Sequence, residues 1–271
     1  MRSLNGAELA DFIKVRQLKQ VRNLRQEHKI VPKLAIVQTV DSSVIDSYAG
    51  LKRRYGADIL VDVDVHKINQ AESMALVDQL NQDEAVHGII IQLPLADPTQ
   101  TDELVNLVAP AKDVDGLGEA ADFDPATPIA INWLLTGYNV DLNNKSIAIV
   151  GAGRLVGAPL ERMWRQSGLE PLVVDEHTDE HQKQAILTKA DIIISAAGVP
   201  GLITSELIRP GAVVVDAGTA TSGGKLVGDV DPAVRQRHDL TITPEKGGVG
   251  PLTVAALFDN LIRAARKTIT S

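Results

Sequence analysis

Short aliphatic runs alternate with amphipathic, helix-like segments along this chain of 271 residues. Runs of Leu, Ile, Val and Ala are typical of buried parallel strands, and the segments between them suit helices that cross from one strand to the next. The alternation therefore predicts an α/β fold. Because aromatic residues make up only 3% of the chain, we expect aliphatic side chains to build its core.

The alternation first runs through the amino-terminal half. A first helix is predicted by apolar residues that recur in steps of three, namely Leu9, Phe12, Val15, Leu18, Val21 and Leu24. A second helix is expected over 42–56, ending at Gly56, and a third over 71–82. Strands are expected between and after these helices, at 34–40, 58–65 and 87–95.

A second series follows a stretch at 110–128 that is rich in Pro, Gly and Asp, which we interpret as a junction between domains. A helix is expected near 128–137 and a closing helix at 251–267. The strands of this series are expected within 146–153, 169–176, 190–198, 211–218 and 240–244. We predict two αβ domains with a cleft between them, the second a Rossmann-like doubly wound parallel sheet. The predicted boundaries are 1–118 plus 252–271 for the first domain and 119–251 for the second.

Charge and composition exclude several functions. The formal net charge of −8 disfavours nucleic acid as a partner. The absence of cysteine excludes disulfides, thiolate nucleophiles and cysteine-bound zinc, and the six histidines have no ligand spacing, so we predict no metal. No apolar run approaches the roughly 20 residues of a membrane helix, and the amino terminus lacks a secretory signal. We therefore expect a cytoplasmic protein with no membrane partner.

Three glycines lie directly between a predicted strand and the predicted helix after it: Gly151, Gly153 and Gly157. Without side chains, the backbone can approach a pyrophosphate, and the N–H groups of the helix terminus can bind it. The spacing is GxGxxxG rather than the common GxGxxG, so a tight turn without a ligand is the alternative.

Asp175 ends the next predicted strand, where an acid can accept hydrogen bonds from the hydroxyls of the adenosine ribose. A carboxylate there would repel the additional phosphate of NADP. Together with Glu176, it favours NAD, although a pair of solvated acids at a strand end is the alternative. The choice between NAD and NADP stays open at this point.

Four polar residues occupy positions that suit catalysis. Tyr48 and Lys52 are four residues apart, on one face of a predicted helix. Gln92 lies near the carboxyl end of a strand, and Asp115 lies in a turn at the predicted junction. A lysine near a neutral amide in a partly desolvated site loses its proton more easily and can assist the attack of water. Taken singly, each residue also suits a structural role.

With these residues, the chain resembles the family of bifunctional methylenetetrahydrofolate dehydrogenase/methenyltetrahydrofolate cyclohydrolases over nearly its whole length. So many matches in one order are not expected by chance. They are Tyr48-x3-Lys52, GIIIQLPL (88–95), KDVDG (112–116), PATP (125–128), IVGAGRLVGAP (149–159), ADIIISAAGVPG (190–201), GDVD (228–231) and TPEKGGVGPLTVA (243–255).

The resemblance implies roles in the first domain. Lys52 would be the general catalyst of the cyclohydrolase step, with Tyr48 positioning the folate, Gln92 orienting the lysine and Asp115 holding the pterin ring. If neutral, Lys52 could take a proton from water; if charged, it could stabilise negative charge on oxygen.

In the second domain, the resemblance implies a site for NAD or NADP. Its cofactor residues would be Gly151, Gly153, Arg154, Gly157, Gly198 and Gly218. Asp175 and Glu176, expected there from their place at the strand end, stand where the family often has His-Ser or His-Arg. The segment from Gly247 to Thr253 would line the cleft beside nicotinamide and folate, and Gly248, Gly250, Pro251 and Thr253 would contact the substrate. The resemblance also implies a homodimer, a tetrahydrofolate derivative as substrate, and a place in one-carbon metabolism and purine biosynthesis.

Departures from the family pattern leave alternatives open. The second helix is expected to end about one turn early, at Gly56, and the stretch between Gly116 and Pro125 is short. These differences allow a monofunctional NAD-dependent dehydrogenase that lacks the cyclohydrolase activity. A non-catalytic ligand-binding scaffold of the same fold is the third hypothesis.

Overall fold

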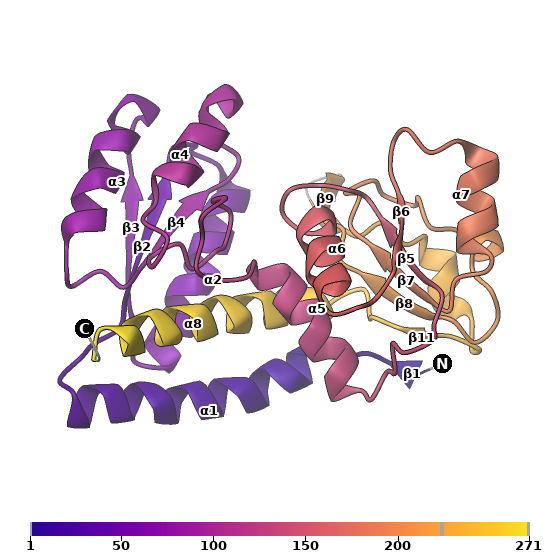
Figure 1. Ribbon diagram of the computed structural model, residues 1–271, viewed down its shortest axis with the longest axis horizontal. Helices are drawn as coiled ribbons and strands as arrows, with labels where there is room; N and C mark the ends of the chain where they lie inside the picture. Colours follow the sequence, from indigo (N-terminus) through magenta and orange to yellow (C-terminus); the bar gives the residue numbers. More distant parts are fainter. Residues whose placement is uncertain (1, 223–224, 270–271) are drawn as a thin grey trace. The chain divides into compact units, whose positions relative to one another are not determined.

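The computed structural model describes residues 2–222 and 225–269, and the chain forms two compact units (Figure 1). Unit 1 comprises Met1–Ala10 and Thr127–Thr253, and unit 2 comprises Asp11–Ala126 and Val254–Ser271. Each unit combines helices with a parallel sheet, so the predicted α/β class is confirmed. No helix of the described ranges is long and apolar enough to cross a membrane.

Unit 1 contains a six-stranded sheet in the order β1-β11-β8-β7-β5-β6, and every neighbouring pair is parallel. The strands β6 and β7 lie on opposite sides of β5, so the chain reverses its direction of winding there. Ligands of such sheets bind outside the carboxyl ends of the strands at this reversal. The strand bounds are Arg2–Ser3 (β1), Ile147–Val150 (β5), Leu172–Val174 (β6), Ile192–Ser195 (β7), Val213–Asp216 (β8) and Thr241–Ile242 (β11).

The edge strand β1 explains why the first residues of the chain cluster with unit 1. Arg2 and Ser3 pair in register with Thr241 and Ile242 of β11. The predicted boundaries instead grouped these first residues with the amino-terminal series, because a two-residue strand has no detectable sequence period.

Three helices accompany the sheet of unit 1: α5 (Ala126–Gly137), α6 (Gly157–Gln166) and α7 (Glu180–Leu187). The sequence did not predict α7, whose amino terminus is capped by Asp179, the acceptor of a hydrogen bond from the backbone of Gln182. It also did not predict the antiparallel hairpin of β9 (Ala220–Ser222) and β10 (Lys225–Val227).

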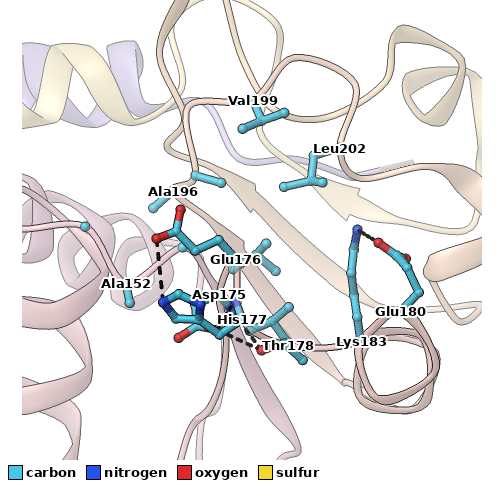
Figure 2. Close-up of a pocket in the computed structure, with 15 residues that line it drawn as sticks. Ala152, Asp175, Glu176, His177, Thr178, Glu180, Lys183, Ala196, Val199 and Leu202 are labelled. Carbon is cyan, nitrogen blue, oxygen red and sulfur yellow. Dashed lines mark hydrogen bonds and ion pairs between the residues drawn. The ribbon is translucent and has the colours of Figure 1, made fainter.

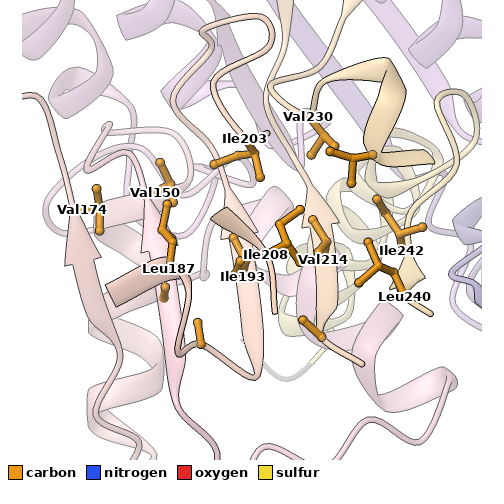
Figure 3. Packing of buried hydrophobic residues seen from close by; sticks show 14 residues of the cluster. Val150, Val174, Leu187, Ile193, Ile203, Ile208, Val214, Val230, Leu240 and Ile242 are labelled. Atoms are coloured by element: carbon orange, nitrogen blue, oxygen red, sulfur yellow. The ribbon is translucent and has the colours of Figure 1, made fainter. Parts of the chain in front are cut away.

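Aliphatic side chains fill the core of unit 1, as expected from the scarcity of aromatic residues. One cluster joins the sheet strands to α7 and to the loops after β7 and β8 (Figure 3). Its most deeply buried members include Ala148, Leu187, Ile193, Val214 and Val234.

Unit 2 contains a three-stranded parallel sheet in the order β3-β2-β4, with bounds Asp62–Lys67, Lys33–Gln38 and Gly88–Gln92. One face of this sheet packs against α3 (Ser73–Gln82) and α4 (Thr101–Leu107) (Figure 1). The sequence predicted α3 but not the short α4. The remaining face carries Gln38 and Gln92, which are register partners at the carboxyl edge.

The second predicted helix is longer than the sequence indicated. The helix α2 spans Ser43–Asp58, so the predicted end at Gly56 is wrong, and β3 begins at Asp62 rather than at position 58. A Cβ on Gly56 would lie 2.5 Å from Cγ2 of Val63. Gly56 therefore lets the helix pack closely on β3, and it does not end the helix.

The apolar face predicted for the first helix, α1 (Gly6–Glu27), is only partly correct. Val21 and Leu24 are buried, but Phe12 and Val15 are 71% and 57% exposed. A step of three residues falls short of the 3.6 residues per turn, so the predicted stripe winds around the helix. The buried face instead includes Ala10 and a polar residue, Gln17.

Gln17 links three helices inside unit 2. Its Nε2 donates to the carbonyl of Ala255 in α8 (Val249–Lys267) at 2.7 Å, and its Oε1 accepts from the hydroxyl of Tyr55 in α2 at 2.7 Å. The ring of Tyr55 stacks on Phe258 of α8, with 5.0 Å between the ring centroids. A buried amide is tolerated here because both of its ends are hydrogen-bonded.

Tyr55→Phe should lower the free energy of unfolding by about 1–3 kcal/mol, because Oε1 of Gln17 is left buried without a donor. Urea denaturation measures the change. The double variant Gln17→Leu with Tyr55→Phe should cost less than the sum of the two single changes. Strict additivity of the three values would contradict this coupling.

Candidate functional site

A lysine and a glutamine meet at the carboxyl edge of the sheet in unit 2. The helix α2 carries Tyr48 and Lys52 one turn apart on one face, and β4 ends at Gln92. Nζ of Lys52 donates to Oε1 of Gln92 at 2.7 Å. Nε2 of Gln92 donates to the carbonyl of Leu93 at 3.1 Å, which fixes the amide with its oxygen toward the lysine.

Asp115 acts electrostatically on the same lysine. Burial lowers the pKa of Lys52, and the negative charge of Asp115 opposes that shift. Burial likewise raises the pKa of Asp115, and Lys52 opposes it. Tyr48 is half-buried, and burial raises the pKa of its phenol. Three of the four residues predicted from the first series thus form one interacting group, with Tyr48 on the same helix face.

The turn that carries Asp115 is held by Asp113, a residue to which the sequence analysis gave no role. The two carboxylate oxygens of Asp113 accept from the backbone N–H groups of Gly116 at 2.9 Å and Gly118 at 2.7 Å. Burial raises the pKa of Asp113 to about 6, although these N–H donors favour the charged form. The spacing Asp-x-x-Gly in KDVDG is the signal that could have indicated this turn.

Gln38 is a second residue that the sequence analysis missed. It is buried at the end of β2, in register with Gln92. Its Nε2 donates at 2.9 Å to Oδ1 of Asp46 in the first turn of α2. The two glutamines therefore both attach α2, the helix that carries Lys52, to the edge of the sheet.

Asp115→Asn should lower the pKa of Lys52 further below its ordinary value, because the substitution removes the charge that favours the ammonium. The pH dependence of the NMR chemical shift of the Lys52 side chain measures this pKa. The signal is assigned as the one that is missing in the Lys52→Met variant. Asp97→Asn, at an exposed carboxyl group of the same unit, is the matched control and should leave the titration unchanged. A rise in the pKa of Lys52 in the Asp115 variant would refute the interpretation.

Unit 1 contains a cavity of about 570 Å³, within the size range of small-molecule sites. Four predicted cofactor residues line it: Gly151, Gly153, Asp175 and Glu176. Figure 2 shows the acids beside His177 and Thr178, and Lys183 with its partner Glu180. The loop after β7 contributes four apolar residues to the lining, namely Ala196, Ala197, Val199 and Leu202.

The glycine turn joins β5 to α6 by close backbone contacts. Gly151 has a φ of 99°, and a Cβ on it would lie 2.6 Å from the carbonyl oxygen of Ala196. A Cβ on Gly157 would lie 1.8 Å from the carbonyl oxygen of Gly151. Gly157 is also the first residue of α6. The amino terminus of α6 consequently lies against the turn, as anion binding requires.

Asp175 is fixed by its own loop. Its Oδ1 accepts from the backbone N–H of His177 and from the hydroxyl of Thr178, both at 3.0 Å. The same two groups lower the pKa of Asp175, the backbone of His177 most, so its carboxylate is charged at neutral pH. Thr178 was missed, although the spacing Asp-x-x-Thr at a strand end indicates such a turn.

Other predicted residues are not among those that line the cavity. Arg154 is exposed in the glycine turn, and Gly198, with a φ of 69°, follows Ala197 in the loop after β7. Gly218 follows β8 and packs against Asp229. In the segment at 248–253, Gly248 is buried just before α8, and Gly250, Pro251 and Thr253 lie in its first turns. Across residues 2–222 and 225–269, no group of three or more His, Asp or Glu side chains is placed to hold a metal.

The parallel sheet, the glycine turn and the acid after β6 define unit 1 as a dinucleotide-binding α/β unit of the dehydrogenase class. The family described as tetrahydrofolate dehydrogenase/cyclohydrolase, NAD(P)-binding domain, matches residues 125–269. Its partner, the catalytic domain of the same family, matches residues 4–115.

Curated relatives agree with this match. The bifunctional protein FolD of a Nitratiruptor species is 34% identical over 98% of this chain and 99% of its own length. The FolD protein of Aquifex aeolicus is 35% identical over 97% of this chain and 95% of its own.

Solved structures agree as well. The FolD methylenetetrahydrofolate dehydrogenase/cyclohydrolase of Campylobacter jejuni has a TM-score of 0.92 at 32% identity, with 99% of each chain covered. The Trypanosoma brucei enzyme, complexed with NADP cofactor and inhibitor, has a TM-score of 0.93 at 28% identity and covers 99% of this chain and 98% of its own. The chain belongs to the tetrahydrofolate dehydrogenase/cyclohydrolase family, and the predicted resemblance is confirmed.

Proposed function

We propose that the chain oxidises 5,10-methylenetetrahydrofolate to 5,10-methenyltetrahydrofolate with NAD(P) and hydrolyses the methenyl product to 10-formyltetrahydrofolate. The observation that carries the proposal is the contact of Lys52 with Gln92 beside the charge of Asp115, in a chain whose other unit has a dinucleotide cavity. A scaffold without catalysis has no need of a half-buried lysine kept near a neutral amide.

The cavity of unit 1 fits a dinucleotide. A Cβ on Gly153 would have no other atom within 4 Å, so the backbone there is open to a ligand. The N–H groups at the start of α6 would bind the pyrophosphate, and Asp175 would accept from the ribose hydroxyls. When bound, NAD(P) would supply a hydride acceptor for the folate methylene carbon, and the residues of the site would contribute mainly by positioning the two reactants.

The hydrolytic step would use Lys52. Water adds to the methenyl carbon and gives up one proton to a base. The second proton of the water ends on the ring nitrogen N5 as the bond from that carbon to N5 breaks, which leaves the formyl group on N10. Burial lowers the pKa of Lys52 and so reduces the cost of forming its neutral amine. We propose that this neutral form takes the proton of water. Gln92 orients this amine, Asp115 would accept from N–H groups of the pterin, and Tyr48 would pack on the folate.

Lys52→Met should abolish hydrolysis of the methenyl product and leave hydride transfer within about tenfold of the original rate, because only the first of these reactions needs the base. Cofactor reduction and decay of methenyl absorbance, followed separately, measure the two steps. Unimpaired hydrolysis in the variant would exclude Lys52 as the base. A parent protein that transfers hydride but never hydrolyses would instead be the monofunctional dehydrogenase.

We further propose NAD as the preferred cofactor. Three acids line the cavity, namely Asp175, Glu176 and Glu180, against one lysine, Lys183. Nζ of Lys183 lies 3.3 Å from Oε1 of Glu180, so its charge is already paired. The additional phosphate of NADP would therefore meet net negative charge.

Asp175→Ser should raise the ratio of kcat/KM for NADP to that for NAD by roughly tenfold, because one repulsive charge near the second phosphate is removed. Initial rates with each cofactor on the folate substrate give the ratio. Asp179→Asn, which keeps the cap of α7 and lies outside the cavity lining, is the control. An unchanged ratio in the Asp175 variant would show that this acid does not face the ribose.

A homodimer, a cytoplasmic location and substrate contacts from Gly248, Gly250, Pro251 and Thr253 are also part of this proposal. They rest on the family resemblance. The mass of the protein in solution, measured by light scattering, tests the dimer.

A further inference from the structure

The loop after β7 forms one wall of the dinucleotide cavity. Ala196, Ala197 and Val199 all line the cavity (Figure 2). The backbone of Ala196 also lies directly against the glycine turn, since only the missing side chain of Gly151 permits their approach. The position of this loop therefore sets both the apolar wall and the space available at the turn.

A single buried carboxylate holds that loop. Asp229 is 0% exposed. Its Oδ2 accepts from the hydroxyl of Ser195 at 2.7 Å and from the backbone N–H of Ala197 at 2.8 Å, and its Oδ1 accepts from the backbone N–H of Val199 at 2.8 Å. All three contacts are donors to the carboxylate, and two of them come from residues of the cavity wall.

A second carboxylate fixes the segment that carries Asp229. Asp216, at the end of β8, accepts from the backbone N–H of Asp229 at 3.0 Å and of Val230 at 3.1 Å. Arg235 pairs with Asp216 at 2.8 Å. Burial raises the pKa of Asp216, and the N–H donors and Arg235 act against that shift.

Two glycines make this arrangement possible. A Cβ on Gly218, two residues after Asp216, would lie 2.1 Å from Cγ of Asp229. A Cβ on Gly228, directly before Asp229, would lie 2.1 Å from Oδ2 of Asp216. Each aspartate thus occupies the space left by the glycine of the other segment, so Asp229 has no freedom to change its position.

We infer that Asp229 is a positioning residue of the dinucleotide site, which acts by fixing the wall Ala196–Val199 against the glycine turn. The inference rests on the proposed function. Asp229 does not contact the cofactor, because its side chain is fully buried and its oxygens are engaged. An asparagine at this position would direct its NH2 group at one of these donors and release part of the wall.

Asp229→Asn tests the inference in the full-length protein. We expect the KM and the Kd for NAD to rise about tenfold or more, as for the loss of a hydrogen bond to a buried charge. The kcat at saturating NAD should fall much less, and methenyl hydrolysis without cofactor should stay within about twofold, since Lys52 lies in unit 2. Asp231→Asn, which changes the neighbouring carboxylate that caps a short helix, is the control.

Ser195→Ala removes one donor to Asp229 without changing the backbone of the wall. It should raise the KM for NAD about two- to fivefold, again with hydrolysis preserved. An unchanged KM in both variants, or an equal loss of hydride transfer and hydrolysis in both, would overturn the inference. Failure of the parent protein to bind NAD or NADP in calorimetry would instead overturn the proposed function.

Discussion

A lysine withdrawn from water sets the requirements for the catalytic half of this protein. Burial favours the neutral amine of Lys52, while Asp115 favours the ammonium, and Gln92 accepts a hydrogen bond from either form. The pKa of Lys52 therefore depends on side chains that keep their positions. Neighbouring contacts hold them: Gln38 and Gln92 attach α2 to the sheet, and Asp113 closes the turn of Asp115.

Aspartate side chains have the same structural role in both units. In each, a buried or fixed aspartate accepts backbone N–H groups and so determines the shape of a loop at the carboxyl edge of a parallel sheet. Asp113 does this in the turn that carries Asp115, Asp175 at the proposed ribose position and Asp229 at the cavity wall. Short loops at this edge carry the functional residues, because the strands beneath them are buried and rigid.

The sequence predicted what periodicity and spacing encode. Alternating aliphatic runs indicated both parallel sheets, and the i,i+4 pair of Tyr48 and Lys52 does lie on one helix face. Contacts between residues far apart in the sequence could not be predicted from it. Gly56 suggested a helix end, whereas its role depends on Val63, and the exposure of Phe12 depends on which face of α1 meets α8. Asp229 was visible in the GDVD motif, but its partners come from the strand and loop 30 to 34 residues earlier.

Two acid–glycine pairs fit together in unit 1, namely Asp229 with Gly218 and Asp216 with Gly228. This fit limits which substitutions these positions can accept. A side chain added at either glycine collides with the opposite aspartate, and a shortened aspartate leaves buried N–H groups without an acceptor. No single replacement among the four positions is therefore neutral. We therefore expect an acid and its facing glycine to change together in related chains. The exposed acids beside Asp175 have no such facing partner and can change singly, which under the proposed function would adjust the choice of cofactor.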